Sequence, residues 1–569
     1  MNTTYEPIVS ANSGPYRGKA LVGSYSVIIG WTFDDEQLRN GLKGFAIKRI
    51  DYDPTNGEIL RLNWLGGYKR FKETDDGQVE NISSLEGPFQ RFRWNDYTLR
   101  SDRTYRYEVY PIRGNPNALT KNEKPLIFDV CPSKEDQDGM GVYVNRGVTA
   151  AKAYLQRFNN QSPSEIGQKA YTWLSRGLKE SLLNFIAQAK SGEALHVAIY
   201  EFFDHEIAQT LKDAISRNVD VTIVHDAKKG KKSTLENKEV IKHFNLDPPI
   251  TIPRTTVNIS HNKVVIKLVS GEPKEVWTGS ANFSENAFNF QTNTALIIRD
   301  LKTVEYYEEY FQGLTGNPSK KDSKIINKEI MERANSETNR FVDKIFFSPI
   351  KKKDILKSSV ELIKSAQSAI LISAPFGLDK TMIEALHSNS DDIIEYGLVN
   401  STAKKKIETL HRKNTRYFTP KRLETYMGKT WDAKAFGAHK IHAKTIIIDP
   451  WSNNPKVLIG SANFSKYSCS DNDENALLIT GNKRLSAILT TEFMRMYDHY
   501  KSRYYIDKFN KANKEIKKDN KERIANGQEP KPFIKMDEYL KNDEKWSKTA
   551  FDSNSSSHKF RDRIVFSGG

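Results

Sequence analysis

Cysteine is almost absent from this sequence of 569 residues, which contains only Cys131 and Cys469. Two cysteines so far apart exclude a disulfide framework and the closely spaced ligand pairs of a structural zinc site. No stretch approaches the roughly 18 consecutive apolar residues of a membrane span, so we expect no transmembrane segment. Residues 1–10 also lack the basic start and apolar run of a secretory signal, which favours a cytoplasmic protein.

The charge balance is strongly basic, with 87 Lys and Arg residues against 71 Asp and Glu residues and a formal net charge of +16. Excess positive charge attracts polyanions, either nucleic acid or an acidic membrane surface. Charge alone does not choose between these partners. The length exceeds what one hydrophobic core supports, so we expect several domains.

Residues 1–140 contain short runs of alternating apolar and polar residues, separated by Asp, Asn, Gly and Pro. This pattern predicts an all-β antiparallel sandwich. Trp31, followed much later by the tyrosine-rich run 105–111, resembles a fibronectin type III or similar immunoglobulin-like module. Such a domain offers a surface for a protein partner.

From residue 141 the pattern changes to helices that are followed by buried strands. Apolar spacing predicts a helix over 171–190, and the next apolar runs predict strands at 195–200 and 219–224 with a helix at 207–215 between them. Residues 355–399 repeat the theme, with strands expected at 369–373 and 393–399. This alternation predicts two similar α/β halves.

We place the first α/β half at 141–330 and the second at 331–505, joined by a charged stretch at 318–344. Residues 506–569 form a charged C-terminal extension. Lys and Glu are dense over 501–535 with helical spacing, which favours a solvated helix and linker and leaves a nucleic-acid-binding arm open.

An internal repeat lies within the two halves. His261-Asn-Lys263 and the run Gly279–Ser284 recur as His442-Ala-Lys444 and Gly460–Ser465, each displaced by 181 positions without a gap. Residues two apart in a strand point to one face. Each His and its Lys are therefore expected side by side, and the Asn of each Gly-Ser-Ala-Asn run, Asn282 or Asn463, lies within reach of the same place.

This set of side chains suits a phosphate group. Lysines neutralise its charge, amides bind its oxygens, and a histidine attacks phosphorus or donates a proton. A single His-x-Lys motif would indicate no more than an ordinary strand with a surface lysine. Two copies, each followed by the same Gly-Ser-Ala-Asn run at the same spacing, favour one shared site. The chain lacks the compact carboxylate cluster of two-metal nucleases, so we expect neither a metal nor another cofactor.

His-x-Lys followed by Gly-Ser-x-Asn, present twice, resembles the phospholipase D superfamily of phospholipases, nucleases and tyrosyl-DNA phosphodiesterases. The resemblance covers roughly residues 165–500. It implies two phospholipase D-like α/β sandwich halves related by a pseudo-twofold axis, with one active site at their seam, complete within one chain. It also implies cleavage of a phosphodiester through a covalent phosphohistidine.

The two copies differ at two positions. The family's usual acid, five residues after the lysine, is Asp449 in the second copy but Leu268 in the first; in the family this acid is mainly structural. Eleven residues after the asparagine, the second copy has Glu474 and the first has Asn293. The resemblance implies that Glu474 supports His261 across the seam and that Asn293 supports His442.

This asymmetry assigns roles to the two histidines. A carboxylate behind an imidazole fixes its tautomer and stabilises the imidazolium, which favours His261 as the nucleophile. His442 is then the proton donor and the base that activates water. Lys263, Lys444, Asn282 and Asn463 would hold the transition state by charge and hydrogen bonds.

The substrate is less constrained than the chemistry. The basic balance, the basic residues over 501–535 and a lysine loop favour a nuclease acting on DNA or RNA, with bacterial defence against phage as a fitting role. The loop contains Lys228, Lys229, Lys231 and Lys232.

Two alternatives remain open: a phospholipase D-type lipid hydrolase or transphosphatidylase, and a catalytically dead nucleic-acid-binding scaffold. Four other histidines are expected in the core or on the surface: His205, His225, His411 and His439. His439 and the adjacent Lys440 are also candidates for the entrance to the site.

Overall fold

The computed structural model describes residues 4–568 apart from 76, 78–80, 148–150, 160, 339–340, 352–353, 401–409, 411–414, 420–440 and 535–537. His411, His439 and Lys440 lie outside the described residues. Among the helices that are described, none is both long and apolar enough to cross a membrane.

The N-terminal region consists of two sheets that share one aromatic core. The core contains Trp31 and Phe33 of one sheet and Phe45 and Tyr107 of the other, all buried. The alternation in the sequence therefore predicted this β domain correctly. The first sheet has the order β1 (Ile8–Ser13), β2 (Tyr16–Val22), β3 (Val27–Phe33), β8 (Arg93–Asp96). The second has the order β10 (Ala118–Thr120), β9 (Thr104–Asn115), β4 (Gly44–Tyr52), β5 (Ile59–Trp64), with β11 (Leu126–Val130) also paired to β9.

An eight-stranded sheet forms the first α/β half. Its strands in spatial order are β12 (Asp136–Gln137), β13 (Met140–Val144), β19 (Thr294–Ile298), β18 (Glu272–Gly279), β17 (Lys263–Val269), β14 (Ala194–Ile199), β15 (Asp220–Asp226) and β16 (Thr251–Arg254). β14, β15 and β16 are parallel, and the other pairs are antiparallel. Because β12 already pairs with β13, this sheet begins before the boundary expected at residue 140.

The seven-stranded sheet of the second half has the matching order. Its strands are β20 (Lys344–Ser348), β26 (Glu474–Thr480), β25 (Lys456–Gly460), β24 (Thr445–Ile448), β21 (Ala369–Ser373), β22 (Ile394–Leu398) and β23 (Thr415–Phe418). From β13 to β16, each strand of the first sheet has a counterpart at the same place here, with the same parallel and antiparallel pairs. The two halves are thus two copies of one topology.

One predicted helix is divided in two. The spacing over 171–190 predicted a continuous helix, but α3 (Gln168–Ser175) ends at Ser175 and α4 (Leu178–Ala187) begins at Leu178. The two residues between them, Arg176 and Gly177, both have positive φ. The break turns the buried Arg176 guanidinium to Val144 O at 2.8 Å and to Glu492 at 2.5 Å. A distant partner in the fold therefore overrides the local apolar spacing.

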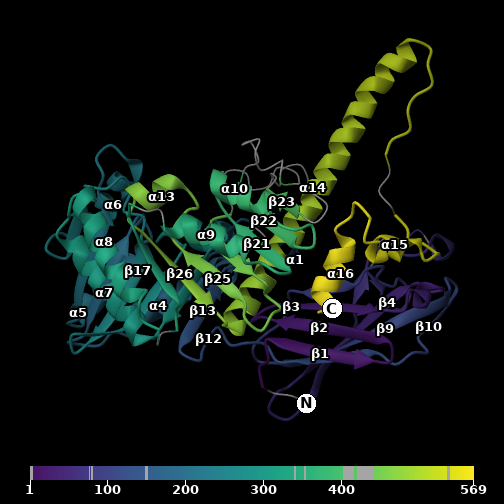
Figure 1. Ribbon diagram of the computed structural model, residues 1–569, viewed down its shortest axis with the longest axis horizontal. Helices are drawn as coiled ribbons and strands as arrows, with labels where there is room; N and C mark the ends of the chain where they lie inside the picture. The colour runs from purple at the N-terminus through teal and green to yellow at the C-terminus, as the bar shows by residue number, and fades with distance from the viewer. Residues whose placement is uncertain are drawn as a thin grey trace.

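Helices cover the two sheets (Figure 1). In the first half these include α5 (His205–Ser216) and α6 (Lys232–His243), which contact β15, whereas α1 (Ala151–Phe158) and α2 (Pro163–Ile166) pack on α3. α7 (Leu301–Thr315) and α8 (Lys320–Ala334) connect the halves, and α9 (Asp354–Lys364), α10 (Lys380–His387) and α13 (Lys466–Asp471) belong to the second. One hydrophobic core cluster includes Val264 and Tyr310 of the first half and Phe347 and Ile447 of the second.

The C-terminal extension is more than a solvated tail. α14 (Lys483–Ala525) runs through the boundary expected at residue 505 and its far end projects from the body (Figure 1). The chain then returns, and α15 (Lys545–Phe551) and α16 (Lys559–Ser567) pack on the β domain. Phe551 stacks on Phe33 with ring centroids 4.9 Å apart. These helices complete the aromatic core that the N-terminal strands begin.

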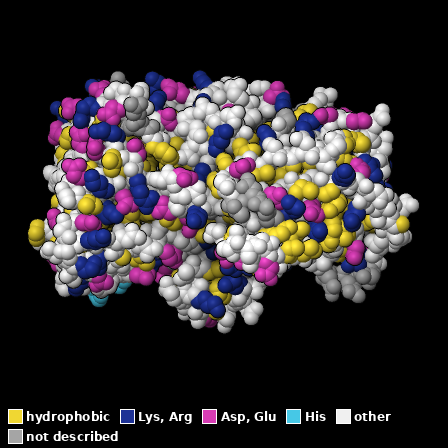
Figure 2. Space-filling model, turned by 90° about the horizontal axis from the view of Figure 1, so that it is seen from below, with side chains coloured by type: hydrophobic (Ala, Val, Ile, Leu, Met, Phe, Trp, Pro, Cys, Tyr) yellow, Lys and Arg dark blue, Asp and Glu magenta, His cyan; other side chains and the backbone are white. Residues whose placement is uncertain are grey.

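Positive charge is not gathered on the face shown in Figure 2, where Lys and Arg side chains alternate with Asp and Glu side chains. The net charge of +16 therefore does not form a single field on this side of the molecule.

Candidate active site

Two backbone bridges join the halves directly beside the repeated motifs. In one, the backbone N–H of His261 donates to Asp473 O and the N–H of Asp473 donates to Ile259 O, both at 2.9 Å. In the other, the N–H of His442 donates to Thr292 O at 3.0 Å. Asp473 and Thr292 are equivalent positions of the repeat, so each half holds the histidine segment of the other in the same way.

His261 lies against a carboxylate from the opposite half. Its Nδ1 is 2.7 Å from Glu474 Oε2, and the Glu474 carboxylate also accepts hydrogen bonds from Ser461 Oγ at 2.9 Å and Ser468 Oγ at 2.7 Å. Burial lowers the pKa of His261 to about 4, although Glu474 opposes the shift. Burial alone would raise the pKa of Glu474, but its interactions with His261 and Lys263 outweigh burial and lower that pKa. The neutral imidazole thus donates through Nδ1 and leaves Nε2 with a free lone pair.

His442 has an amide as its partner instead. Its Nδ1 lies 2.9 Å from Asn293 Oδ1, while Asn293 Nδ2 donates to Ala287 O at 2.9 Å and Ser280 Oγ donates to Asn293 Oδ1 at 2.8 Å. These bonds orient the amide oxygen towards His442, so Nδ1 is again the donor. Burial and the charges of Lys444 and Lys263 hold the pKa of His442 well below its ordinary value.

Each lysine reaches back to the carbonyl of its own histidine. Lys263 Nζ donates to His261 O at 2.5 Å, and Lys444 Nζ donates to His442 O at 2.7 Å. β17 begins at Lys263 and β24 begins after Lys444, so both histidines precede the strands on which we expected them. Burial lowers the pKa of Lys263 to about 7 and that of Lys444 well below its ordinary value. Burial thus disfavours the charged form of both lysines, and a bound anion would stabilise that charged form.

The amides of the Gly-Ser-Ala-Asn runs reveal a residue that the sequence analysis missed. Asn282 Nδ2 donates to Glu201 Oε2 at 2.6 Å, and the charges of Lys263 and Lys444 act on the same carboxyl. Burial raises the pKa of Glu201 above its ordinary value. By strand register the matching residue of the second half is Phe376. Glu201 lies outside the repeated motif, which is why the repeat could not identify it.

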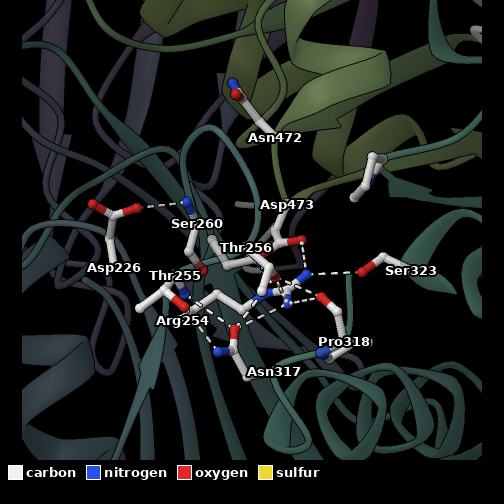
Figure 3. A network of polar contacts seen from close by, with 12 residues as sticks. Asp226, Arg254, Thr255, Thr256, Ser260, Asn317, Pro318, Ser323, Asn472 and Asp473 are labelled. Carbon is white, nitrogen blue, oxygen red and sulfur yellow. Dashed lines mark hydrogen bonds and ion pairs between the residues drawn. The ribbon is translucent and has the colours of Figure 1, made fainter. Parts of the chain in front are cut away.

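A second group missed from the sequence lies behind the site. Arg254, at the end of β16, donates to Asp473 from Nε at 2.8 Å and from Nη2 at 3.1 Å, and it also contacts Thr256 and Ser323 (Figure 3). Both partners of this ion pair are fully buried. Nearby, Asp226 accepts a hydrogen bond from the N–H of Ser260 at 2.8 Å. These contacts fix the residues that immediately precede His261 and Glu474.

Comparison with known families identifies the two halves. The family described as cardiolipin synthase, phospholipase D-like domain, matches residues 182–315 and again residues 360–497, so that each match contains one copy of the repeat. The chain belongs to the phospholipase D superfamily. No curated protein matches the sequence.

Several solved structures are similar to the chain, each with a low TM-score. Polyphosphate kinase from Porphyromonas gingivalis is 14% identical over 54% of this chain, with a TM-score of 0.37, and the chain spans only 43% of that protein. Phosphatidylserine synthase from Haemophilus influenzae Rd KW20 is 12% identical over 57% of this chain and 85% of its own, with a TM-score of 0.40. The phospholipase D family member Nuc from Salmonella typhimurium is 28% identical over 24% of this chain and 84% of its own, with a TM-score of 0.20.

The acid that varies between the copies of this phospholipase D-like repeat acts on the backbone. Asp449 accepts hydrogen bonds from the N–H groups of Gln367, Ser368 and Ala369 at 2.7–3.0 Å, where β21 begins. Its counterpart Leu268 is buried and joins the hydrophobic core. Asp449 thus orders a strand start that the first half forms without an acid.

The lysine loop lies between β15 and α6 and divides into two kinds of residue. Lys228 and Lys231 are half-buried and donate to the carbonyls of Thr255 and Asn258. Lys229 and Lys232 are exposed, and Lys232 pairs with Glu236 at 3.1 Å. Because Asn258 lies three residues before His261, this loop borders the candidate active site of the phospholipase D-like halves.

The remaining histidines have other surroundings. His225 is buried in β15, and His205 stacks on His243 with ring centroids 5.3 Å apart. Within the described part of the chain, no three His, Cys, Asp or Glu side chains are grouped as metal ligands would be.

Proposed function

We propose that this phospholipase D-like chain hydrolyses the phosphodiester bonds of nucleic acid through a phosphohistidine on His261. The unequal support of two buried histidines carries the proposal. His261 contacts the carboxylate of Glu474, whereas His442 contacts the amide of Asn293. Only the first arrangement provides a countercharge for a histidine that becomes positive as it attacks.

The first step transfers the phosphoryl group to the protein. The lone pair on His261 Nε2 attacks phosphorus, and the bond from phosphorus to the leaving oxygen breaks. His442 donates its Nε2 proton to that oxygen, so the alcohol leaves neutral. A bound phosphodiester anion raises the pKa of His442, which burial and the two lysines otherwise depress. Substrate binding thereby loads the acid with its proton.

The second step releases the phosphate. Neutral His442 accepts a proton from a water molecule while the water oxygen attacks phosphorus, and the bond between phosphorus and His261 Nε2 breaks. The products are a phosphate monoester and the resting pair of histidines. Lys263 and Lys444 neutralise the charge on the equatorial oxygens, and Asn282 and Asn463 donate hydrogen bonds to them.

Nucleic acid is proposed as the substrate because of charge around the site. The exposed Lys229 and Lys232 belong to the loop whose other two lysines contact the segment that precedes His261, and the chain carries a net charge of +16. Such lysines bind phosphates without reading sequence. A lipid substrate would be favoured by an apolar surface near the site, and a dead scaffold by loss of a His, Lys or Asn. Both His-x-Lys pairs and both asparagines are present.

A substrate panel with acid-quenched mass spectrometry tests the proposal. Purified protein is mixed with DNA, RNA, phosphatidylcholine and anionic phospholipid, with and without excess EDTA, and phosphorylated peptides are mapped. We expect cleavage of nucleic acid in EDTA and an adduct on His261. Cleavage of lipid alone would reverse the substrate assignment, and loss of activity in EDTA that added divalent ion restores would overturn the metal-free mechanism.

His442→Ala is expected to accumulate the adduct, because the attack is slowed but breakdown is slowed more. His261→Ala is expected to form none. His225→Ala is a matched control, since His225 is equally buried but contacts neither histidine of the site. An adduct on His442 with His261 unmodified would exchange the two roles.

A further inference from the structure

A cavity of about 740 Å³ lies between the β domain, α14 and the C-terminal helices, away from the seam. None of the described residues that line it belongs to the proposed catalytic set. Six of them are cationic: Arg91, Arg93, Arg416, Lys501, Lys559 and Arg563. Because β8, β23, α14 and α16 all contribute, the cavity exists only after the C-terminal segment has returned to the β domain.

A second cavity of about 720 Å³ adjoins the first. The two share Gln90, Arg91, Trp94, Trp546 and Lys559 as lining residues. Lys69, Lys541 and Lys545 add further positive charge to the second, and none of its described lining residues is acidic. The two cavities therefore adjoin along a cationic lining, and we call them together the C-terminal channel.

The acids in this channel are already paired. Asp498 accepts hydrogen bonds from Arg93 at 3.3 Å and Tyr97 at 2.9 Å, and Asp562 contacts Arg93 and Tyr396. By contrast, Arg91 and Lys559 have no ion pair with any described residue. Burial and the positive charge of Arg91 lower the pKa of Lys559. The centre of the channel thus places two unneutralised cations close together, and an anion between them would relieve their repulsion.

Aromatic rings accompany the cations along the channel. Trp94 lines both cavities, with one face stacked on Phe89 at 4.1 Å between ring centroids. Tyr505 lines the first cavity and is 47% exposed, and Tyr68 lines the second and is 61% exposed. The exposed rings of Tyr68 and Tyr505 therefore offer flat stacking surfaces at the channel.

We propose that the C-terminal channel binds single-stranded nucleic acid at a site distinct from the catalytic seam. A row of cations that tracks phosphates, with aromatic rings on which bases stack, is the arrangement that binds single strands without sequence preference. An isolated small anion would need only one cavity, and a lipid chain would need a lining without repeated charges. The inference deepens the proposed function, on which it rests, by naming a strand-holding site for the nuclease.

Binding is measured on His261→Ala/His442→Ala protein, so that the strand stays intact. Fluorescence anisotropy of a labelled oligothymidylate is followed with rising salt. Adding Arg91→Glu/Lys559→Glu is expected to weaken binding by about tenfold or more and to reduce the salt slope. The control Lys302→Glu/Lys328→Glu changes the net charge equally on exposed lysines of α7 and α8, and its effect should stay within about twofold.

Two further variants separate binding from folding. Arg91→Gln/Lys559→Gln removes the charges without adding acids, and its thermal unfolding is compared with that of the parent protein. Tyr68→Ala/Tyr505→Ala removes two partly exposed rings without changing the charge and should weaken binding by about fivefold or more. Ultraviolet crosslinking of a strand that carries bromodeoxyuridine should map to peptides that contain Tyr68, Trp94 or Tyr505.

The outcomes distinguish this inference from the proposed nuclease activity. Binding that depends on Arg91 and Lys559 supports the channel even if wild-type protein cleaves no nucleic acid. Cleavage of nucleic acid with binding unchanged in the stably folded channel variants overturns the channel and leaves the nuclease. Equal competition by inorganic tripolyphosphate or free nucleotide would also overturn the strand site, because it would indicate a small-anion pocket.

Discussion

Arg254 and Asp473 form a two-bonded ion pair across the seam, with both side chains fully buried. Asp473 immediately precedes Glu474, whose carboxylate contacts His261, and the backbone of Asp473 pairs with the segment that contains His261. Arg254 is therefore a positioning residue: it acts on the nucleophile only through its neighbours.

Replacing Arg254 with Met leaves the Asp473 carboxylate buried without its cation. We expect a loss of about 3–5 kcal/mol in the free energy of unfolding, measured by denaturant titration. Arg333→Met is the matched control, because Arg333 pairs with Glu309 on the surface and such pairs contribute about 0–1 kcal/mol. Equal losses in the two variants would contradict the role of the buried pair.

The side chains that contact the two histidines, Glu474 behind His261 and Asn293 behind His442, can be changed separately to test their unequal roles. Glu474→Gln removes the countercharge of His261 and should lower kcat on the order of a hundredfold or more, yet less than His261→Ala. Asn293→Asp places a carboxylate behind His442 and should raise the pKa of that histidine. If Glu474→Gln leaves the yield of His261 adduct and kcat unchanged, the carboxylate has no role in attack.

The pH dependence of kcat/KM follows from the depressed pKa values of the site. His261 must be neutral to attack, so activity should rise as pH increases through about 4. Lys263, Lys444 and His442 must all be protonated for the first step, and burial lowers the pKa of each, so activity should fall at higher pH, with Lys263 losing its proton at about 7. Lys263→Arg keeps its proton and should move the upper limb to higher pH; an unchanged upper limb would assign it to another group.

The lysine loop should affect substrate binding through its exposed members. Lys229→Glu/Lys232→Glu is expected to weaken binding of a labelled oligonucleotide and to reduce the slope of log affinity against log salt by roughly 0.7 for each lost phosphate contact. Lys228 and Lys231 already donate to backbone carbonyls, so their reversal should destabilise the loop as well. A slope unchanged by the exposed pair would remove this loop from the binding surface.

The C-terminal helices should be needed for stability of the β domain. Phe551 is buried against Phe33, and Phe551→Ala is expected to cost about 3–5 kcal/mol. The exposed Phe533 supplies the control, because Phe533→Ala should change stability by less than about 0.5 kcal/mol. Similar values for the two variants, measured by denaturant unfolding, would argue against a shared core.

Local pattern predicted most of the elements because hydrophobic periodicity is a property of neighbouring residues. The strand expected at 369–373 is β21, and the strand expected at 195–200 is β14 within one residue. The helix over 171–190 was wrong in its continuity, since Arg176 leaves the helical path to reach Glu492. The immunoglobulin-like detail of the β domain stays a prediction.

The sequence alone determined which chemical groups the two motifs carry and that they occur in one register, because the repeat is written in the order of residues. Only the tertiary structure revealed Glu201 beside Asn282 and Arg254 behind Glu474. Neither belongs to the repeat. The same is true of the C-terminal channel, whose cations come from segments near residues 91 and 559. Residues so distant along the chain meet only through packing of the aromatic core, which no local pattern specifies.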